Sequence, residues 1–458
     1  MDYSDFRVTP IRPRDIARDI VLRLQQAGFA AFWVGGCVRD FLLGREAEDF
    51  DIATDAKPGD VEELFPRTIP VGKKFGVIIV LQDGHQFEVA TFRAEAEYTD
   101  GRRPGKVVYA NAEADASRRD FTVNGLFYDP IARQTHDWVG GEKDLCARII
   151  RTIGVPEDRF GEDHLRMLRA VRFAARLGFE IDHKTFAAIQ TLAPKIKLIS
   201  AERIRDELIK LFAPPTDMTV LVSGMAPAER GLKLLHESGL LAQILPELEA
   251  TVNCEQTPDF HPEGSVFNHL CLMLRKLPAG AHESLPWAVL MHDIAKPVTT
   301  ERVGDRIHFY GHEKVGTIMA EDILAKLKFP KKQITEIATC VRHHMQFKDV
   351  KEMRKSTVRR LLMRETFPLE LELHRLDCLG SNGDLEHYNY LKEQAAELEK
   401  QPTVRPPLLT GTDLIALGFK PGRDLGALLA ELREKQLSDE LTTPDAAKTW
   451  VLENKVKP

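Results

Sequence analysis

Several features that would place this 458-residue chain in a specialised class are missing from its sequence. The six cysteines are scattered and form no CxxC pair, which argues against a disulfide framework or a cysteine zinc site and favours free thiols in a reducing compartment. No run of about 18 apolar residues occurs, so no segment is expected to span a membrane. The opening residues, MDYSDFRVTPIRPRD, are charged and unlike a signal peptide. We therefore expect a cytoplasmic protein.

An excess of positive charge is also missing. The formal net charge is −6, with 43% hydrophobic and 29% charged residues, which is an ordinary globular composition. This balance argues against a protein that coats nucleic acid along its whole surface, but it allows a local basic groove. The length exceeds what one core usually organises, so several domains are expected.

The residue patterns divide the chain into four parts. Residues 1–155 alternate short strand-like and helix-like patterns, in which GVIIVLQDGHQFEVATF predicts a β-hairpin that turns near Asp83 and Gly84. Helical patterns follow over 156–215, 216–400 and 401–458, and the proline-rich KQPTVRPPLLTG predicts a linker before the last part. RDIARDIVLRLQQAGF predicts a helix that ends near Gly28, and GEDHLRMLRAVRFAARLGF predicts one continuous helix that ends at Gly178.

The stretch DFDIAT places two aspartates two residues apart in a predicted strand, where alternate side chains share a face. Two like charges side by side require a cation or a partner, and paired carboxylates suit Mg²⁺, which usually keeps phosphates as further ligands. Asp49 and Asp51 are therefore candidate magnesium ligands. Glu88 alternates with Phe87 and Val89, which makes it a candidate third carboxylate. The alternative is that the aspartates are exposed charges on a strand edge.

Gly35 and Gly36 lie between a predicted strand and a predicted helix. Glycines let the backbone approach a phosphate closely, and a helix N-terminus favours an anion. Arg39 would lie on the first turn of that helix. An ordinary tight turn is the alternative explanation of the glycine pair.

Three motifs together resemble a known family: VGGCVRDFLLG…DFDIAT, RRDFTVNGLFYD (118–129) and EDHLRMLRAVRFAARLGF. Their order and spacing are similar to those of the bacterial class II tRNA nucleotidyltransferases and poly(A) polymerases, members of the DNA polymerase β-like superfamily. The resemblance implies an α/β head with a small mixed sheet over 1–155, followed by an all-α neck over 156–215, an HD domain within 216–400 and a helical tail over 401–458.

The resemblance also implies roles for individual residues. Asp49 and Asp51 would bind Mg²⁺, with Glu88 as the further catalytic carboxylate. The residues expected to bind the nucleotide are Gly35, Gly36, Arg39, Arg119, Asp120, Asp163, Arg166, Arg169 and Arg172. The segment YTDGRRPGKV (98–107) is similar to a flexible loop of the family that helps the pocket to change from C to A.

Asp163 and Arg166 are expected to read the base. Cytosine and adenine both present an exocyclic amino donor next to a ring-nitrogen acceptor, which a carboxylate and a guanidinium match. Uracil and guanine present a carbonyl and an N–H at these positions, so both contacts would be mismatched. One Asp–Arg pair can therefore select C and A without a nucleic-acid template.

A second set of residues follows the order H…HD…H…H…D over about 262–380 and resembles the HD phosphohydrolase domain. Neutral imidazoles with carboxylates suit a divalent transition metal. The matching residues are His269, His292, Asp293 and Asp377 as core ligands, with His312 and His344 as a second-metal set. Each histidine alone could also be an ordinary helix residue.

The leading hypothesis is addition of CCA to tRNA 3′ ends from CTP and ATP by two-metal nucleotidyl transfer, with tRNA as partner and a hydrolase activity at the HD site. The alternatives are a poly(A) polymerase and an enzyme that adds only A. PVGKKFGVIIV lacks the histidine of the corresponding strand in bacterial poly(A) polymerases, and residues 401–458 balance eight basic against eight acidic residues. Both features favour tRNA. The basic segment KEMRKSTVRRLLMR (351–364) predicts either a contact with RNA phosphates or a solvated helix, and the oligomeric state is left unpredicted.

Overall fold

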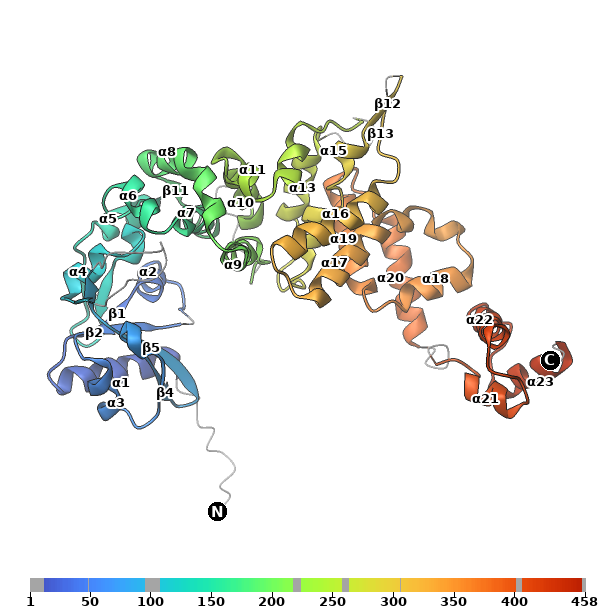
Figure 1. The fold of residues 1–458 in the computed structure, drawn as a ribbon, viewed down its shortest axis with the longest axis horizontal. Helices are drawn as coiled ribbons and strands as arrows, with labels where there is room; N and C mark the ends of the chain where they lie inside the picture. Colours follow the sequence, from blue (N-terminus) through green and yellow to red (C-terminus); the bar gives the residue numbers. More distant parts are fainter. Residues whose placement is uncertain are drawn as a thin grey trace, which may run out of the picture. The chain divides into compact units, whose positions relative to one another are not determined.

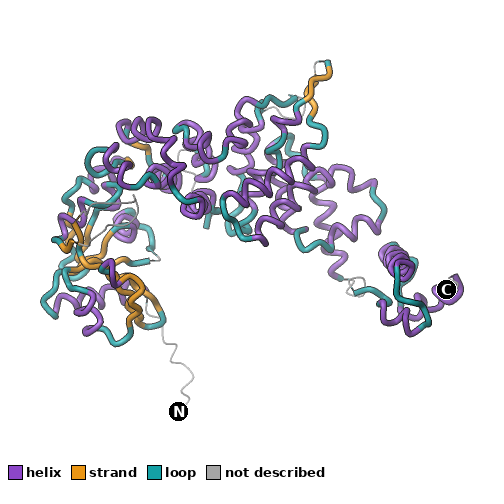
Figure 2. Tube along the Cα trace, viewed as in Figure 1, coloured by secondary structure: helices purple, strands orange, loops and turns teal. Residues whose placement is uncertain are grey.

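The computed structural model describes residues 12–47, 49–94, 108–216, 224–257, 263–304, 306–400 and 406–454. The chain forms two compact units (Figure 1). The first unit contains residues 1–211 and 230–244, and the second contains 212–229 and 245–458. The predicted division into four domains is finer than these two units and stays a prediction. Figure 2 shows that strands gather in the first unit, whereas the second is almost entirely helical.

A seven-stranded sheet forms the centre of the first unit. The order is β3-β4-β5-β2-β1-β8-β9, and β2 pairs antiparallel with β1 but parallel with β5, so the sheet is mixed. The expected fold class, a small mixed α/β sheet followed by a largely helical body, is confirmed. The strands are β1 Ala31–Val34, β2 Asp51–Thr54, β3 Thr68–Gly72, β4 Val77–Gln82, β5 His85–Thr91, β8 Phe127–Asp129 and β9 Gln134–His136.

Helices cover this sheet and continue from it. On the first helix, Ile16, Ile20 and Leu24 recur at intervals of four and are fully buried or nearly so, as an amphipathic helix requires. The helices that lie wholly or mostly in this unit are α1 Pro13–Gln26, α2 Gly36–Leu42, α3 Pro58–Leu64, α4 Ala112–Ser117, α5 Gly141–Ala147, α6 Pro156–Glu162, α7 Leu165–Leu177, α8 His183–Leu192, α9 Ala201–Phe212, α10 Pro227–Glu237 and α11 Leu240–Ile244. Two short strand pairs accompany them, β6 Arg93–Ala94 with β7 Val108–Tyr109 and β10 Ile149–Ile150 with β11 Glu180–Ile181.

The prediction of one continuous helix through EDHLR was wrong. Helix α6 ends at Glu162 and α7 begins at Leu165, because Asp163 adopts an extended conformation with φ −150° and ψ 104°. The Asp163 carboxylate accepts a hydrogen bond from the backbone N–H of Leu165 at 3.0 Å, which satisfies one of the unpaired donors at the start of α7. The predicted end at Gly178 is confirmed, since this residue has φ 71° after the last turn.

The second unit is built from helices and one hairpin, β12 Glu301–Val303 with β13 Arg306–His308, which the sequence did not predict. Its helices are α12 Pro246–Glu249, α13 Val266–Arg275, α14 Leu285–Met291, α15 Lys296–Thr299, α16 His312–Lys326, α17 Lys331–His343, α18 Lys355–Leu362, α19 Phe367–Gly380, α20 Glu386–Glu399, α21 Gly411–Ala416, α22 Arg423–Leu437 and α23 Pro444–Asn454. The 3₁₀ turns of the chain are Lys73–Phe75, Thr122–Asn124, Ala193–Leu198, Ala250–Asn253 and His344–Glu352. Within the described ranges, no helix carries an apolar stretch long enough to cross a lipid bilayer.

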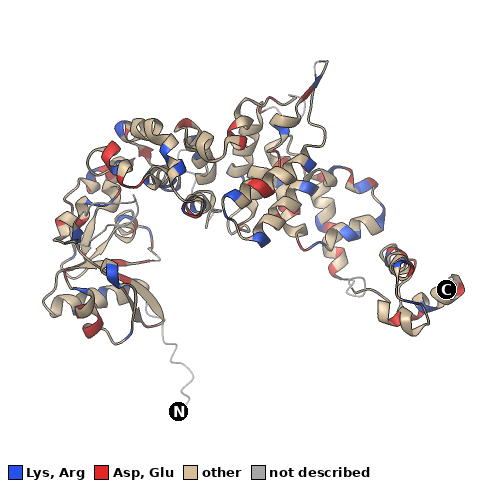
Figure 3. Ribbon diagram, viewed as in Figure 1, with Lys and Arg blue, Asp and Glu red and all other residues tan. Residues whose placement is uncertain are grey.

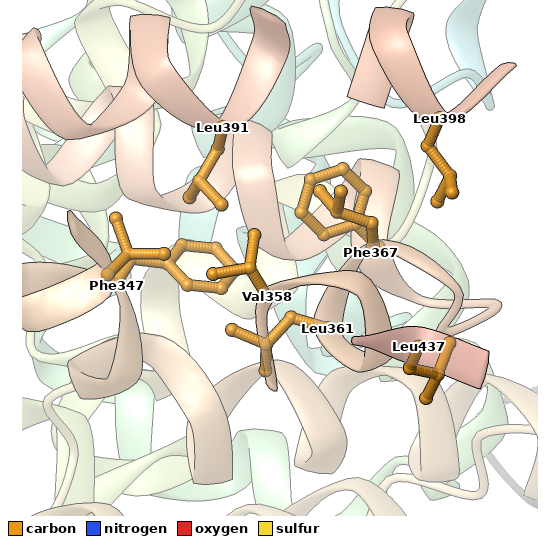
Figure 4. Packing of buried hydrophobic residues seen from close by; sticks show 9 residues of the cluster. Phe347, Val358, Leu361, Phe367, Leu391, Leu398 and Leu437 are labelled. Carbon is orange, nitrogen blue, oxygen red and sulfur yellow. The ribbon is translucent and has the colours of Figure 1, made fainter. Parts of the chain in front are cut away.

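One apolar cluster joins α18, α20 and the end of α22 (Figure 4). The side chains that Figure 4 labels in it are Phe347, Val358, Leu361, Phe367, Leu391, Leu398 and Leu437. Leu437 belongs to the C-terminal region, so the cluster ties that region to the preceding helices by burial of apolar surface. Positive and negative residues are interspersed along the helices of both units (Figure 3).

Candidate active site and candidate metal centre

Three carboxylates meet at one end of the central sheet. Parallel pairing of Ile52 with Val89 sets Asp51 beside Glu88 on neighbouring strands. Asp49 lies just before β2, so its predicted place inside the strand was wrong, yet its charge still acts on Asp51. Partial desolvation, then the negative charges of Glu88 and Asp49, raise the pKa of Asp51 to about 6. Such a concentration of negative charge is what a divalent cation would neutralise.

A cavity of about 440 Å³ lies next to these carboxylates. It is lined by Gly35, Gly36, Arg39, Asp51, Arg118, Arg119, Asp120, Asn124, Asp163, Leu165, Arg166, Arg169, Phe173 and Arg203. Nine of the expected site residues therefore line this one cavity. Asp49, Glu88 and Arg172 are not among its lining residues. Gly35 has φ 74°, which favours glycine, and a Cβ built on it would lie 3.0 Å from Arg119 Nη1, so any side chain here would push the Arg119 guanidinium aside.

A buried polar network orders the guanidinium groups of the cavity. Arg39 donates to Asn124 at 2.7 Å, Asn124 donates to Asp120 at 3.1 Å, and Arg169 binds the other oxygen of Asp120 at 2.6 Å. Burial alone would raise the pKa of the Asp120 carboxyl, but the charge of Arg169 lowers it below its ordinary value. Asp120 is thus an ionised acceptor that fixes the orientation of Arg169.

A second acidic residue, Asp115, was not singled out from the sequence. It is 1% exposed and binds Arg118 at 2.5 Å and Arg119 at 3.1 Å. It also accepts a hydrogen bond from the backbone N–H of Arg93, at the edge of the segment 95–107. The predicted loop 98–107 falls outside the described residues. Asp115 lies three residues before Arg118 and four before Arg119, the first two residues of the RRDFT motif. This helical spacing is the sequence feature from which the contact could have been predicted.

The two residues expected to read the base are held by different partners. Asp163 forms an ion pair with Arg203 of α9 at 2.5 Å. Arg166 pairs with Glu162 and donates to the backbone carbonyl of Arg159 at 3.1 Å. Arg203 was missed because it lies 40 residues from Asp163 in the sequence. Glu162 was missed although it lies four residues before Arg166, a spacing that pairs opposite charges on helices.

Arg169 and Arg172 of α7, together with Arg39 of α2, surround an aromatic ring. Arg172, which does not line the cavity, binds Glu207 of α9 at 2.5 Å, and Arg169 lies 3.6 Å from the same carboxylate. The guanidinium carbons of Arg39, Arg169 and Arg172 lie 5.3, 5.3 and 4.1 Å from the centre of the Phe173 ring. A cation over an aromatic face is stabilised by the ring quadrupole, so Phe173 and Glu207 together allow this positive charge to gather.

The second unit brings the expected histidines and aspartates together in two groups. His269, His292 and Asp377 form one, and Asp293, His312 and His344 form the other; in each group the ligand atoms lie within 4.8 Å of one another. Four helices and a 3₁₀ turn supply or flank them, so the centre exists only in the folded unit. Asp293 follows His292 directly and therefore lies between the groups, 3.1 Å from His292 Nε2 and 3.4 Å from His312 Nε2.

Backbone carbonyls determine which ring nitrogen carries the proton in three of these imidazoles. The Nδ1 atoms of His292, His312 and His344 lie 2.8, 2.8 and 2.6 Å from the carbonyl oxygens of Val289, Phe309 and Val341. A carbonyl only accepts, so each Nδ1 carries the proton and each Nε2 presents a lone pair to the centre. The Nε2 atoms of His312 and His344 are 3.0 Å apart, and two lone pairs at that distance call for a cation between them.

The charges around His344 and Asp293 agree with this donor set, whereas, against the effect of burial, the carboxylates of Asp377 and Glu263 raise the pKa of His269 to about 9. Burial lowers the pKa of His344 to about 3, which keeps its imidazole neutral as metal binding requires. Burial would raise the pKa of Asp293, but His292 and Lys296 lower it well below its ordinary value. Lys296, 2.7 Å from Asp293, was missed although it ends the HDIAK stretch. His269 is 3.0 Å from Asp377 and, through Nδ1, 2.8 Å from the buried Glu263, another residue that the sequence did not reveal.

A cavity of about 590 Å³ opens onto this centre. Three cationic side chains, Lys296, Arg306 and Lys348, line it together with the ligands of the second group. The rings of His308 and Tyr310 also line it and are stacked 5.1 Å apart. The centre therefore faces a space with positive charge and aromatic surface.

Comparison with known proteins identifies domains in both units. Family models match the poly A polymerase head domain over residues 31–151, the probable RNA- and SrmB-binding site of polymerase A over 178–216, and the HD domain over 265–380. The chain is 46% identical over 196 residues to the CCA-adding enzyme of Staphylococcus aureus strain MRSA252, which is 43% of this chain and 49% of that protein. It is 44% identical over 233 residues to that of Geobacillus sp. strain WCH70, 51% and 55% of the two chains. The matches thus span about half the length of these curated relatives.

Solved structures extend the likeness to the whole chain. The crystal structure of the Bacillus stearothermophilus CCA-adding enzyme in complex with CTP aligns with a TM-score of 0.71 and 28% identity, covering 97% of this chain and 98% of that one. The Thermotoga maritima CCA-adding enzyme complexed with tRNA shares the fold, with a TM-score of 0.59, 17% identity and coverage of 98% and 97%. The chain combines a poly A polymerase head domain, the RNA-binding segment of such polymerases and an HD domain, and its resemblance to the tRNA nucleotidyltransferase and poly(A) polymerase family is confirmed.

Proposed function

We propose that this protein adds C, C and A to the 3′ end of tRNA from CTP and ATP. The observation that carries the proposal is that one cavity is lined by Asp51, by the arginines Arg39, Arg119 and Arg169, and by the pair Asp163 and Arg166. The similarity to CCA-adding enzymes favours this activity over poly(A) synthesis. A cytoplasmic location is part of the proposal, supported by six cysteines that form no disulfide.

In the proposed reaction Asp49 and Asp51, with Glu88 beside them, would hold Mg²⁺. The ion would supply charge neutralisation for the nucleophile and for the pyrophosphate leaving group. Arg39, Arg119 and Arg169 face the triphosphate and offset its charge. The 3′-hydroxyl of tRNA attacks the α-phosphate, the new ester bond forms, and the bond to pyrophosphate breaks. Since the chemistry is mainly positioning and charge stabilisation, the ordered arginines contribute much of the rate.

The test is extension of three tRNA transcripts, ending before C74, after C75 and after A76, with CTP and ATP separately and together. We expect CCA on the first, A on the second and no addition to the third. A long A-tail on any transcript would identify a poly(A) polymerase. Extension of only the CC-ended transcript by one A would identify an A-adding enzyme, and no extension would overturn the proposal.

We also propose that the second unit is a metal-dependent phosphohydrolase acting on phosphate esters or cyclic phosphates at RNA ends. The convergence of Nε2 lone pairs from His292, His312 and His344 on Asp293 supports it, since such a donor set fits a divalent transition metal. The metal would supply an activated water, and Lys296 and Lys348 would face the phosphate. The test is hydrolysis of 4-nitrophenyl phosphate after dialysis against chelator and addition of Mn²⁺, Co²⁺ or Ni²⁺. No turnover with any metal would reject the hydrolase.

A further inference from the structure

An ion pair that the sequence motifs do not reveal joins Asp163, in the turn between α6 and α7, to Arg203 on α9. We propose that Arg203, on α9, is a positioning residue that fixes the carboxylate of Asp163 and thereby sets the selection of C and A over U and G. This inference rests on the proposed nucleotide addition and deepens it.

The two oxygens of Asp163 are held from opposite directions. Oδ1 accepts from the backbone N–H of Leu165 at 3.0 Å, at the start of α7, and Oδ2 accepts from Arg203 Nη2 at 2.5 Å. The last torsion of an aspartate side chain is broad, so one bond alone would leave the carboxylate free to rotate. Two bonds on two different oxygens fix its plane. Each oxygen can still accept a further hydrogen bond, so an exocyclic amino group can be recognised without loss of either contact.

The backbone of Asp163 does not supply this rigidity by itself. The residue lies between α6 and α7 in an extended conformation and belongs to neither helix. Its side chain is 21% exposed and that of Arg203 is 24% exposed, so both atoms of the pair are partly shielded from water. An ion pair in this setting is stronger and less screened by salt than an exposed one.

Arg166, the other base-reading residue, is held independently of α9. Its partners are Glu162 and the carbonyl of Arg159, both on α6, and Glu162 also accepts from Arg159 at 3.1 Å. The acceptor and the donor of the base-reading pair are therefore oriented by different helices. A change at Arg203 alters the acceptor alone.

We expect the orientation of the Asp163 carboxylate to affect discrimination between ATP and UTP more than the affinity for nucleotides in general. A site that is built to hydrogen-bond a donor rejects an analogue that presents a carbonyl there, because buried polar groups would be left mismatched. A carboxylate free to rotate can turn away from a uracil carbonyl and relieve that mismatch. Loss of Arg203 is thus expected to improve the relative use of UTP and to impair that of ATP.

The experiment compares Arg203→Gln and Arg203→Lys with Arg205→Gln, a matched control on the same helix whose partner is the neighbouring, exposed Asp206. Each variant extends a CC-ended tRNA with ATP or UTP over a range of nucleotide concentrations. We expect the ratio of kcat/KM for ATP to that for UTP to fall at least about tenfold in Arg203→Gln. Arg203→Lys should restore part of it, and Arg205→Gln should match the parent protein.

An equal loss of kcat/KM for both nucleotides would overturn the inference, since it would make Arg203 a phosphate contact or a support of the fold. An unchanged ratio in Arg203→Gln would overturn it as well. Thermal unfolding of every variant shows whether a loss is a loss of folding, and Arg203→Lys keeps the charge if the glutamine variant fails to fold. Asp163→Asn distinguishes the base-reading hypothesis from the positioning hypothesis. Full selectivity in Asp163→Asn would reject the base-reading role of Asp163. If only the Arg203 variants give the contrary result, the positioning role of Arg203 is rejected and the role of Asp163 stands.

Discussion

At the scale of single residues, neighbouring arginines of α7 are stabilised because they share one buried carboxylate on α9. Glu207 is 5% exposed and serves both Arg169 and Arg172. Replacement by glutamine keeps the shape but removes the charge that both cations face. Breaking a buried pair by removing one partner typically costs about 3–5 kcal/mol, and Glu207→Gln should fall near the lower end because Arg169 keeps Asp120. Urea unfolding measures the loss, with the exposed Glu202→Gln on the same helix as control; equal stability of the two variants would contradict the prediction.

A glycine at the cavity wall offers a second prediction at this scale. Gly35 has φ 74°, and an added Cβ would lie 3.0 Å from Arg119 Nη1. Gly35→Ala should therefore strain the backbone by about 1–2 kcal/mol and displace Arg119 from the triphosphate. We expect KM for ATP to rise about tenfold, which is about 1.4 kcal/mol, with a smaller change in kcat. Gly44→Ala is the control, since Gly44 also has a positive φ but open space around it. A KM equal to that of the control would refute the close-approach argument.

Residues proposed to carry the chemistry were easier to place in the cavity from the sequence than the residues that contact and orient them. Arg39, Asp163 and Arg166 lie in local motifs whose spacing is visible in the sequence. Their partners Asn124 and Arg203 come from positions 85 and 40 residues away, and only the fold makes them neighbours. Contacts of that range leave no periodic trace, so the sequence predicted the cavity lining but not the network behind it.

At the scale of elements, helix α18 shows how charge patterns mislead when they are considered alone. The basic segment 351–364 suggested either RNA contact or solvent exposure, but several of its cations face acids of the C-terminal region. Lys355 and Arg359 bind Asp439 at 2.6 and 2.5 Å, and Arg360 pairs with Glu434. These acids lie 74–84 residues further along the chain, beyond the reach of any helical spacing rule.

This pairing predicts that two adjacent arginines contribute unequally to stability. Arg359 is 5% exposed and also donates to the carbonyl of Leu437 at 2.9 Å, so Arg359→Met should cost about 2 kcal/mol through the acceptors left behind. Arg360 and Glu434 are both exposed, so Arg360→Met should cost less than about 1 kcal/mol. Urea unfolding followed by far-UV circular dichroism compares them. Equal costs would show that the contact between α18 and α22 depends on apolar packing around Leu437 rather than on Arg359.

Secondary structure was predicted best where a regular pattern of apolar and polar residues extends over many positions. The helix before Gly28 and the hairpin through Asp83 and Gly84 were foreseen because many residues share one pattern. The β12–β13 hairpin was missed because each strand has only three residues. The break at Asp163 was missed because the apolar period continues across it, and tertiary contacts with Arg203 override the local preference.

At the scale of the whole molecule, the two sites belong to separate compact units and have no residue in common. Substitutions at distant sites without shared partners usually act additively. Asp51→Asn should therefore lower nucleotide addition by about a thousandfold or more, because it removes a proposed Mg²⁺ ligand worth several kcal/mol to the transition state, yet leave metal-stimulated hydrolysis of 4-nitrophenyl phosphate unchanged. Asp377→Asn should do the reverse. Loss of both activities in either variant would mean that the sites are coupled, for instance through binding of one RNA by both units, and that the protein acts as one machine rather than two.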